Sequence, residues 1–191
     1  MVQKLIVQPL DIADVLVVTP AKFGDERGYF SETYNASAFG DAGVAATFVQ
    51  DNQSLSRQKG VVRGLHFQTP PHAQGKLVRV VAGSVLDVAV DIRTGSATYG
   101  KFVSVILSAE NGRQVWLPEG FAHGFCTLEE NTEVIYKVTD YYAPECDSGI
   151  RWNDPQLGID WPFSEDVAIL SDKDKKQPFL SELREIFTYK A

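Results

Sequence analysis

GRQVWLPEGFAHGFCT, residues 112–127, combines a short strand, a turn and a histidine at fixed spacing. Residues 114–117 have strand character, and Pro118 and Gly120 end that strand in a turn. His123 follows three residues after Gly120, and Thr127 closes the stretch. The stretch therefore predicts β structure in which a histidine follows a tight turn.

A second histidine lies upstream in RGLHFQ, residues 63–68, and Lys76 follows His66 by ten residues. This short extended segment supplies a candidate base, a cation and an arginine. A histidine can take a proton from a carbon beside a carbonyl group, and a lysine can neutralise the enolate that forms. The segment is therefore a candidate site for proton transfer at carbon.

Short runs with strand character recur along the chain and are separated by Gly, Pro, Asn or Asp. They lie at residues 15–19, 29–34, 47–50, 61–68, 77–81, 85–92, 102–107, 114–117 and 132–139. Many short strands without intervening helices predict an all-β sandwich or barrel. Residues 36–42 could form a short helix, and a helical tail is expected at about 177–188, where apolar residues recur at roughly helical spacing.

The 191 residues suit one domain, so we expect residues 1–191 to form a single unit. The formal net charge is −7 and no basic cluster occurs, which argues against a nucleic-acid partner. The first ten residues read neither as a signal peptide nor as a membrane span. Two cysteines are typical of free thiols in a reducing compartment. We therefore expect a cytoplasmic protein with no membrane partner.

The stretch at residues 112–127 resembles the second motif of the cupin fold, with Thr127 in place of its usual asparagine. The first motif departs further. Where a metal-binding cupin would place a second histidine, this chain has Gln68, and the expected glutamate is missing from the turn that follows. Two imidazoles without a carboxylate make a poor divalent-metal site, so we expect no metal.

Five segments in order make the chain closely resemble the dTDP-4-dehydrorhamnose 3,5-epimerase family. They are residues 63–68, Lys76, residues 118–125, Tyr136 with Lys137, and residues 170–174. The resemblance implies a cupin-type jelly-roll barrel with short helices, no cofactor and a homodimer. It implies inversion of C3 and C5 of dTDP-4-dehydro-6-deoxy-D-glucose during dTDP-L-rhamnose biosynthesis.

The resemblance also implies roles for individual residues. His66 would be the general base, Tyr136 the acid on the opposite face of the sugar, Asp174 the partner of His66, and Lys76 the group at the C4 oxygen. Residues matching substrate contacts are Arg27, Phe30, Glu32, Gln50, Asn52, Arg63, His123, Tyr142, Asp147 and Lys173, with Asp87 as the carboxylate partner of His123. Asp147 stands where many relatives have glutamate, which puts that contact in question.

Two points stay open at the level of sequence. In a strictly alternating strand, Arg63 and His66 have opposite parity and cannot both point inward. Either Gly64 marks a bulge that re-aims one of them, or Arg63 lies at the strand end and reaches the mouth of the cavity. In addition, Arg27 and Glu32 could form an ordinary surface ion pair.

Other functions remain alternatives. A related sugar-nucleotide epimerase could invert C3 or C5 alone, or take a different nucleotide. A non-catalytic sugar-binding cupin or a metal-dependent cupin dioxygenase would belong to another class. The missing ligands of the first motif argue against the dioxygenase, and the combination of His66, Asp174 and Tyr136 argues against a passive binder.

Overall fold

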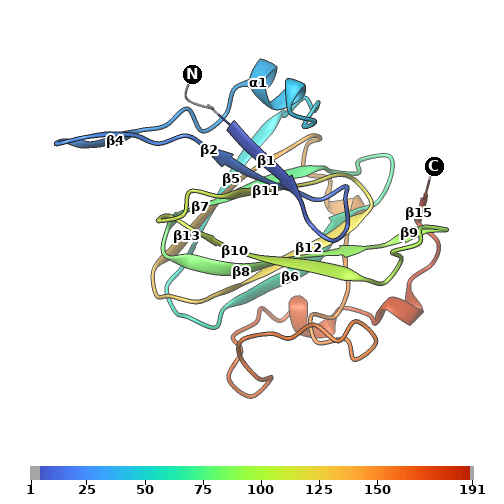
Figure 1. Ribbon diagram of the computed structural model, residues 1–191. Helices are drawn as coiled ribbons and strands as arrows, with labels where there is room; N and C mark the ends of the chain where they lie inside the picture. The colour runs from blue at the N-terminus through green and yellow to red at the C-terminus, as the bar shows by residue number, and fades with distance from the viewer. Residues whose placement is uncertain (1–4, 190–191) are drawn as a thin grey trace.

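Two antiparallel sheets face each other in the computed structural model, which describes residues 5–189 (Figure 1). The six-stranded sheet has the order β1 (Leu5–Pro9), β2 (Leu16–Pro20), β11 (Gln114–Leu117), β7 (Lys76–Ala82), β13 (Thr132–Val138) and β5 (Gln50–Ser56). The five-stranded sheet has the order β10 (Phe102–Ser108), β8 (Ser84–Asp91), β12 (Phe121–Thr127), β6 (Val62–Gln68) and β14 (Asp147–Gly149). The expectation of an all-β chain with few helices is confirmed.

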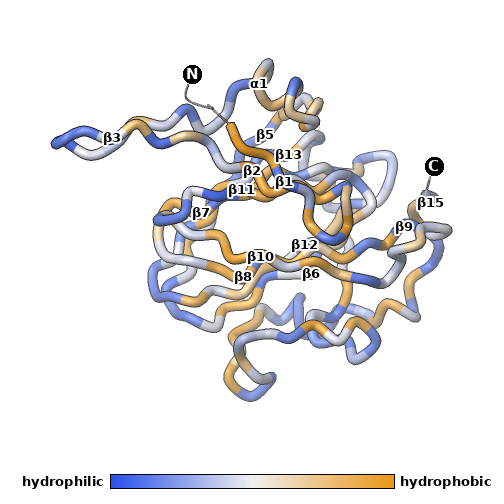
Figure 2. Tube along the Cα trace, in the orientation of Figure 1, coloured by the Kyte–Doolittle hydropathy of each residue, from blue (hydrophilic) through white to orange (hydrophobic). Residues whose placement is uncertain are grey.

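The main hydrophobic core lies between the two sheets. The six-stranded sheet contributes side chains such as Val78 and Leu117, and the five-stranded sheet contributes Leu107, Phe121 and Phe125. Apolar residues accordingly concentrate on the strands, while the connecting segments are more polar (Figure 2). Burying a side chain of this size stabilises a fold by about 1.5–3 kcal/mol.

The five-stranded sheet is covered on its outer face as well. Leu65 and Val88 point away from the main core and pack with Ile150, Leu157 and Leu180 of the C-terminal segment. With both faces covered, every residue of β12 is buried. A strand buried on both faces holds its side chains in one register, which suits a strand that carries a site residue.

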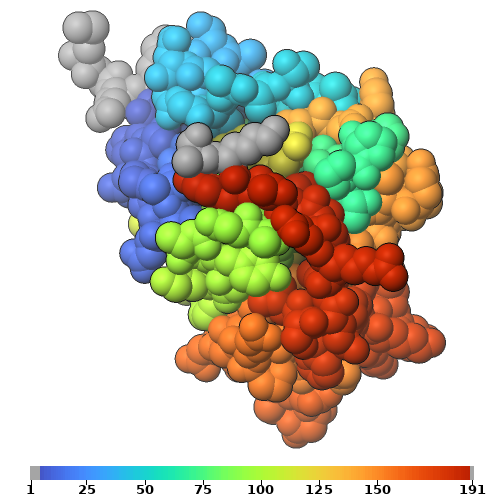
Figure 3. Space-filling view, turned by 90° about the vertical axis from the view of Figure 1, so that its right-hand side faces the viewer, coloured from blue at the N-terminus to red at the C-terminus, as the bar shows by residue number. Residues whose placement is uncertain are grey.

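The C-terminal tail does not form the helix expected at about 177–188. Its only helical piece is the 3-10 turn η3 (Leu180–Glu182), and β15 (Phe187–Thr188) then pairs in parallel with β9 (Arg93–Thr94). In Figure 3 this red segment lies across the yellow-green segment that contains β9. The apolar residues that suggested a helix pack against the outer face of the five-stranded sheet instead.

The remaining helices are short. The helix α1 (Ala36–Asp41) confirms the helix expected at 36–42, and the side chain of Asn35 caps it by accepting a hydrogen bond from the Ala38 amide at 3.1 Å. Two further 3-10 turns, η1 (Pro144–Cys146) and η2 (Asp174–Lys176), flank strand β14 in the sequence. The second of them carries Asp174.

A hairpin of β3 (Phe23–Asp25) and β4 (Gly28–Phe30) projects from the body of the protein (Figure 1). Its aromatic side chains are exposed, Tyr29 by 63% and Phe30 by 70%. Exposed aromatic side chains on a projecting hairpin are unusual for a surface that contacts only water.

Strand β6 carries a bulge where it faces β12. His66 pairs with His123 and Arg63 pairs with Phe125, so two steps on β12 correspond to three on β6. One residue of β6 is therefore extra, and the side chains before and after the bulge change parity. This geometry decides between the two possibilities for Arg63 and His66, because both line the same cavity.

Candidate active site

The cavity lies between the two sheets and has two adjoining lobes of about 290 and 170 Å³. The larger lobe is lined by Ser54, Arg63, His66, Lys76, His123, Phe125, Tyr136, Ser171, Lys173 and Asp174. The smaller is lined by Gln50, Asn52, His66, Phe67, Gln68, Gln74, Lys76, Tyr136, Tyr142, Asp147 and Lys173. His66, Lys76, Tyr136 and Lys173 border both lobes, so these side chains lie where the lobes meet.

His66 on β6 is paired with Asp174, which comes from the turn η2 far along the chain. The Nε2 of His66 lies 2.5 Å from Oδ1 of Asp174, and Oδ2 of the same carboxyl accepts a hydrogen bond from Ser171 at 2.8 Å. With Nε2–H donating to the carboxylate, Nδ1 is the ring nitrogen that can take a proton. The pair has the geometry of an oriented base.

Asp174 is suited to keep its negative charge in this place. Burial opposes its ionisation, but the hydrogen bond and charge of His66, the Ser171 hydroxyl and the charge of Lys173 outweigh burial and hold the pKa of Asp174 below its usual range. An ionised Asp174 fixes the tautomer of His66 and stabilises the imidazolium that forms when a proton is taken.

Lys76 extends from β7 into the junction of the lobes, and its ammonium donates to the backbone oxygen of His66 at 3.3 Å. Burial lowers the pKa of Lys76 to about 8, although the nearby charges of Asp147 and Asp87 favour the cation. Lys76 therefore remains mostly protonated at neutral pH, and its charge is little screened because the side chain is only 8% exposed.

Tyr136 reaches the cavity from β13, in the sheet opposite to the one that carries His66. Burial is the largest of the effects that raise the pKa of its phenol, with the charge of Arg63 opposing the shift and that of Asp147 adding to it. The hydroxyl is therefore protonated at neutral pH. A group in the cavity would have His66 on one side and Tyr136 on the other.

His123 is buried on β12 and pairs with the buried Asp87 of β8, its Nε2 lying 2.9 Å from Oδ2. His123 lines the larger lobe while Asp87 does not, so the carboxylate lies behind the imidazole. The expected contact between these two residues is present in the structure.

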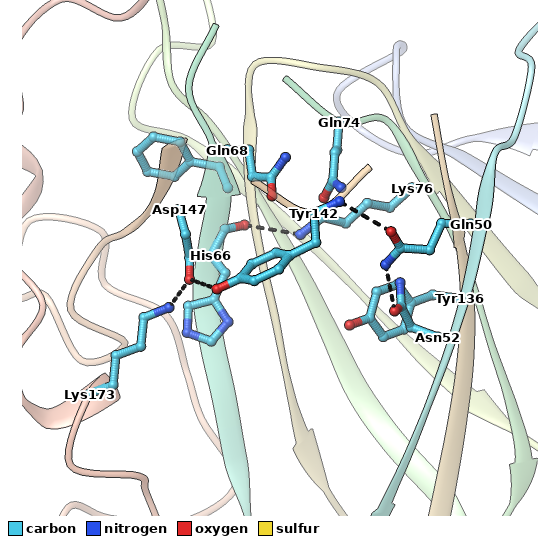
Figure 4. A pocket seen from close by; sticks show the side chains of 11 residues that line it. Gln50, Asn52, His66, Gln68, Gln74, Lys76, Tyr136, Tyr142, Asp147 and Lys173 are labelled. Carbon is cyan, nitrogen blue, oxygen red and sulfur yellow. Dashed lines mark hydrogen bonds and ion pairs between the residues drawn. The ribbon is translucent and has the colours of Figure 1, made fainter. Parts of the chain in front are cut away.

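The smaller lobe holds a chain of polar contacts around Tyr142 (Figure 4). The Tyr142 hydroxyl donates to Asp147 at 3.0 Å, and the ammonium of Lys173 pairs with the same carboxylate oxygen. On the other side, the Tyr142 amide donates to Gln50 at 3.1 Å, and Gln50 donates to Asn52 at 2.8 Å. The aspartate at position 147 is thus long enough to contact both Tyr142 and Lys173.

Three predicted site residues, Arg27, Phe30 and Glu32, are absent from the lining of this cavity. Arg27 and Phe30 lie in the β3–β4 hairpin and its turn, and Glu32 follows directly. Arg27 pairs with Asp25 at 2.6 Å, so the ion pair with Glu32 that the sequence allowed is replaced by one within the turn.

Several lining residues escaped the sequence-based prediction. Gln68, Gln74, Ser54 and Ser171 contribute polar side chains to the lobes. The alternation of β6 offered a signal for Gln68, because residues 66 and 68 share a face of the strand. Gln74 lies in a loop, where no such periodicity applies.

Among residues 5–189, no group of three or more His, Cys, Asp or Glu side chains is placed to hold a metal ion. In the same described part of the chain, no helix is long and apolar enough to cross a membrane.

The fold and the cavity together define an all-β protein that gathers acid–base side chains from two facing sheets. A family model described as dTDP-4-dehydrorhamnose 3,5-epimerase matches residues 9–182, and the chain belongs to that family. A dTDP-4-dehydrorhamnose 3,5-epimerase of Sinorhizobium fredii is 54% identical over 182 residues, which cover 95% of this chain and 93% of the relative.

Solved structures agree with this assignment. The dTDP-6-deoxy-D-glucose-3,5-epimerase of Legionella pneumophila, in complex with dTDP-4-keto-L-rhamnose, has a TM-score of 0.93 and 47% identity, covering 98% of this chain and 100% of that one. A 3′-monoepimerase from Streptomyces bikiniensis, in complex with dTDP-quinovose, has a TM-score of 0.83 and 34% identity, covering 91% of this chain and 87% of that one.

Proposed function

We propose that this protein is a dTDP-4-dehydrorhamnose 3,5-epimerase, an isomerase that inverts C3 and C5 of dTDP-4-dehydro-6-deoxy-D-glucose. The observation that carries the proposal is the position of His66 and Tyr136, which face one cavity from opposite sheets with Lys76 between the lobes. Inversion at carbon requires a base on one side and an acid on the other, and this cavity offers both.

His66 takes the proton. The C4 ketone acidifies the hydrogens on C3 and C5, and Nδ1 of His66 accepts the proton while Asp174 stabilises the resulting imidazolium. One base serves both carbons if the sugar ring turns slightly between the two steps, and if His66 releases its proton to water and Tyr136 regains a proton from water before the second step. No redox step is needed, so we propose that the enzyme works without a cofactor.

Lys76 stabilises the enolate. Loss of a proton at C3 or C5 moves negative charge onto the C4 oxygen, and a buried ammonium interacts with that charge more strongly than an exposed one. Tyr136 then donates its hydroxyl proton to the carbon from the face opposite His66, which inverts the centre.

The two lobes suit the two parts of the substrate. The larger lobe, with His66, His123 and Tyr136, would hold the sugar, and the smaller lobe would hold the thymidine with its base against Tyr142. Arg63, which lines the larger lobe, and Lys173, which lines both, would bind the diphosphate, because charge-assisted hydrogen bonds to phosphate oxygens are strong. Lys173 also forms an ion pair with Asp147.

The active enzyme would be a homodimer in which the β3–β4 hairpin of a second copy completes the nucleotide site. This proposal rests on the projection of the hairpin and on the exposure of Tyr29 and Phe30. It also explains why Arg27, Phe30 and Glu32 lie away from the cavity of their own chain. A fully active monomer by light scattering at micromolar concentration would contradict the homodimer.

We further infer that the two facing sheets form a cupin-type jelly roll and that the whole chain is one domain. The core between the sheets and the packing of the C-terminal segment on the five-stranded sheet support this inference. A cytoplasmic location fits an enzyme that consumes a nucleotide sugar and carries two buried free thiols.

The direct test is incubation with dTDP-4-dehydro-6-deoxy-D-glucose, a downstream reductase and NADPH, in which we expect dTDP-L-rhamnose. The second candidate is inversion at C3 or C5 alone, since a 3′-monoepimerase is among the similar solved structures. With a single inversion, the coupled reductase assay would yield a reduced sugar other than dTDP-L-rhamnose. A non-catalytic sugar-binding cupin would give neither product, and a dioxygenase would show a bound metal by elemental analysis.

A further inference from the structure

Three consecutive backbone amides in the loop after β13 donate to side chains and not to other backbone groups. The amide of Tyr141 donates to Asp140 at 2.7 Å, that of Tyr142 to Gln50 at 3.1 Å, and that of Ala143 to Gln68 at 2.9 Å. These residues belong to no helix or strand. The path of the loop is therefore set by one side chain of its own, Asp140, and by Gln50 and Gln68, which reach it from strands β5 and β6.

Gln68 makes more of these contacts than the other two side chains. It is the last residue of β6 and is only 4% exposed. Besides accepting from Ala143, its amide nitrogen donates to the backbone oxygen of Tyr141 at 3.1 Å and to that of His72 at 2.6 Å. One side chain thus binds the backbone immediately before and immediately after Tyr142, and ties both to the loop after β6.

The ring of Tyr142 depends on this support. Tyr142 is 57% exposed, so packing alone does not fix its ring. Its position is set by the backbone at residues 141–143 and by the hydrogen bond from its hydroxyl to Asp147. Figure 4 shows the side chain of Tyr142 reaching toward Asp147, the contact of its backbone with Gln50, and Gln68 lining the same pocket.

We infer that Gln68 is a positioning residue for nucleotide recognition: it holds the backbone on both sides of Tyr142 and thereby sets the ring against the base of the nucleotide. This inference rests on the proposed function, because it takes the smaller lobe as the nucleotide site. Gln68 itself does not take part in proton transfer. Its loss should therefore change binding of the base more than the chemistry at C3 and C5.

The probes are dTDP and inorganic pyrophosphate, measured by calorimetric titration. Gln68→Met keeps the length of the side chain but removes its donors and its acceptor, so three backbone groups lose their partner. We expect dTDP to bind about tenfold more weakly and pyrophosphate to change by less than about twofold, since pyrophosphate lacks the base. An equal loss for both ligands would overturn the proposal.

A double-mutant cycle distinguishes an effect of Gln68 through Tyr142 from a wider disturbance of the binding site. If Gln68 acts through Tyr142, then Gln68→Met in a Tyr142→Ala background should change dTDP affinity by less than about twofold. A full additional loss in that background would contradict the inference. Kinetically, Gln68→Met should raise KM for the nucleotide sugar while leaving kcat within about threefold, as expected for lost binding.

Thr132→Val is the matched control. Thr132 is fully buried, and its hydroxyl donates to the backbone oxygen of Glu129 at 2.9 Å, but it does not line the cavity. This variant should leave the affinities for dTDP and pyrophosphate unchanged. A loss of dTDP binding equal to that of Gln68→Met would mean that any buried polar deletion has this effect.

A second variant covers the case in which Gln68→Met does not fold. Gln68→Glu keeps the acceptor for the Ala143 amide and loses both donors, so it should also weaken dTDP selectively. If neither variant folds, Gln68 is needed for the stability of the fold, and the proposed role in positioning Tyr142 is overturned. If the selective loss of dTDP is seen but wild-type protein inverts no sugar, the inference stands and the proposed function falls.

Discussion

Gly64 and Gly124 bring strands β6 and β12 closer together than any side chain would permit. A β-carbon on Gly64 would lie 2.5 Å from Cα of Gly124 and 2.7 Å from the backbone oxygen of His123. Gly64 also has a φ of +127°, which L side chains rarely adopt. This contact lies within the bulge between Arg63 and His66, which lets both side chains face the cavity.

Gly64→Ala should therefore reduce both stability and activity. We expect a loss of about 2–5 kcal/mol in the free energy of unfolding, from backbone strain together with the collision against β12. Gly28→Ala is the control for the backbone alone, because Gly28 has a φ of +130° and open space around its α-carbon. It should cost about 1–3 kcal/mol by denaturant unfolding. Equal losses in the two variants would show that the close approach of the strands is unimportant.

The opposite placement of His66 and Tyr136 predicts that their loss has different effects. Tyr136→Phe should lose inversion but keep some solvent deuterium exchange at C3 or C5, because the base and Lys76 remain. His66→Ala should lose both, with a fall in rate of about 10² to 10⁴. Proton NMR in D₂O separates exchange from inversion. Inversion by His66→Ala at the wild-type rate would show that the base lies elsewhere.

Asp174→Asn should reduce kcat by about 10²-fold and change KM little, because the amide keeps the shape of the partner but does not stabilise the imidazolium. Steady-state kinetics with a coupled reductase gives both parameters. Asp172→Asn is the control: Asp172 lies two residues away, and its side chain is 90% exposed. The assignment of the carboxylate fails if both substitutions reduce kcat equally.

The buried Lys76 predicts an alkaline limit to activity. Since burial lowers the pKa of Lys76 to about 8, the free enzyme loses this cation as the pH rises through 8, and kcat/KM should fall by about tenfold for each further pH unit. Below pH 8 the ammonium is present and the limit disappears. A guanidinium stays charged over this range, so any residual activity of Lys76→Arg should lack the fall. A wild-type kcat/KM that is flat from pH 7 to 10 would exclude this role for Lys76.

Much of the fold could be predicted from the sequence because turn residues separate short apolar runs. The strand at residues 114–117 is observed with those bounds, and the run at 61–68 differs by one residue from β6. The strand expected at 47–50 in fact begins at Gln50 and runs to Ser56. Its mostly polar residues alternate between half-buried and exposed positions and form no apolar run that would have predicted it. The prediction of a helical tail was wrong because a segment of that length gains more stability from packing on a sheet than from helical hydrogen bonds.

The candidate site could likewise be predicted only in part from the sequence. His66 and Asp174 are distant in sequence, and only the resemblance to a family joined them before the structure showed their contact. The parity conflict between Arg63 and His66 pointed to the bulge but left its existence open, since pairing partners determine a bulge. Gln68 was read as a missing metal ligand, and its three backbone hydrogen bonds depend on loops whose paths the sequence does not specify.

The measurement that tests the central claim most directly is proton NMR of wild-type protein with dTDP-4-dehydro-6-deoxy-D-glucose in D₂O. If His66 and Tyr136 act on both carbons from opposite faces, then C3 and C5 should each take up deuterium, and the product should have the inverted configuration at both. Exchange and inversion at only one carbon, or exchange at both with the original configuration kept, would contradict the claim.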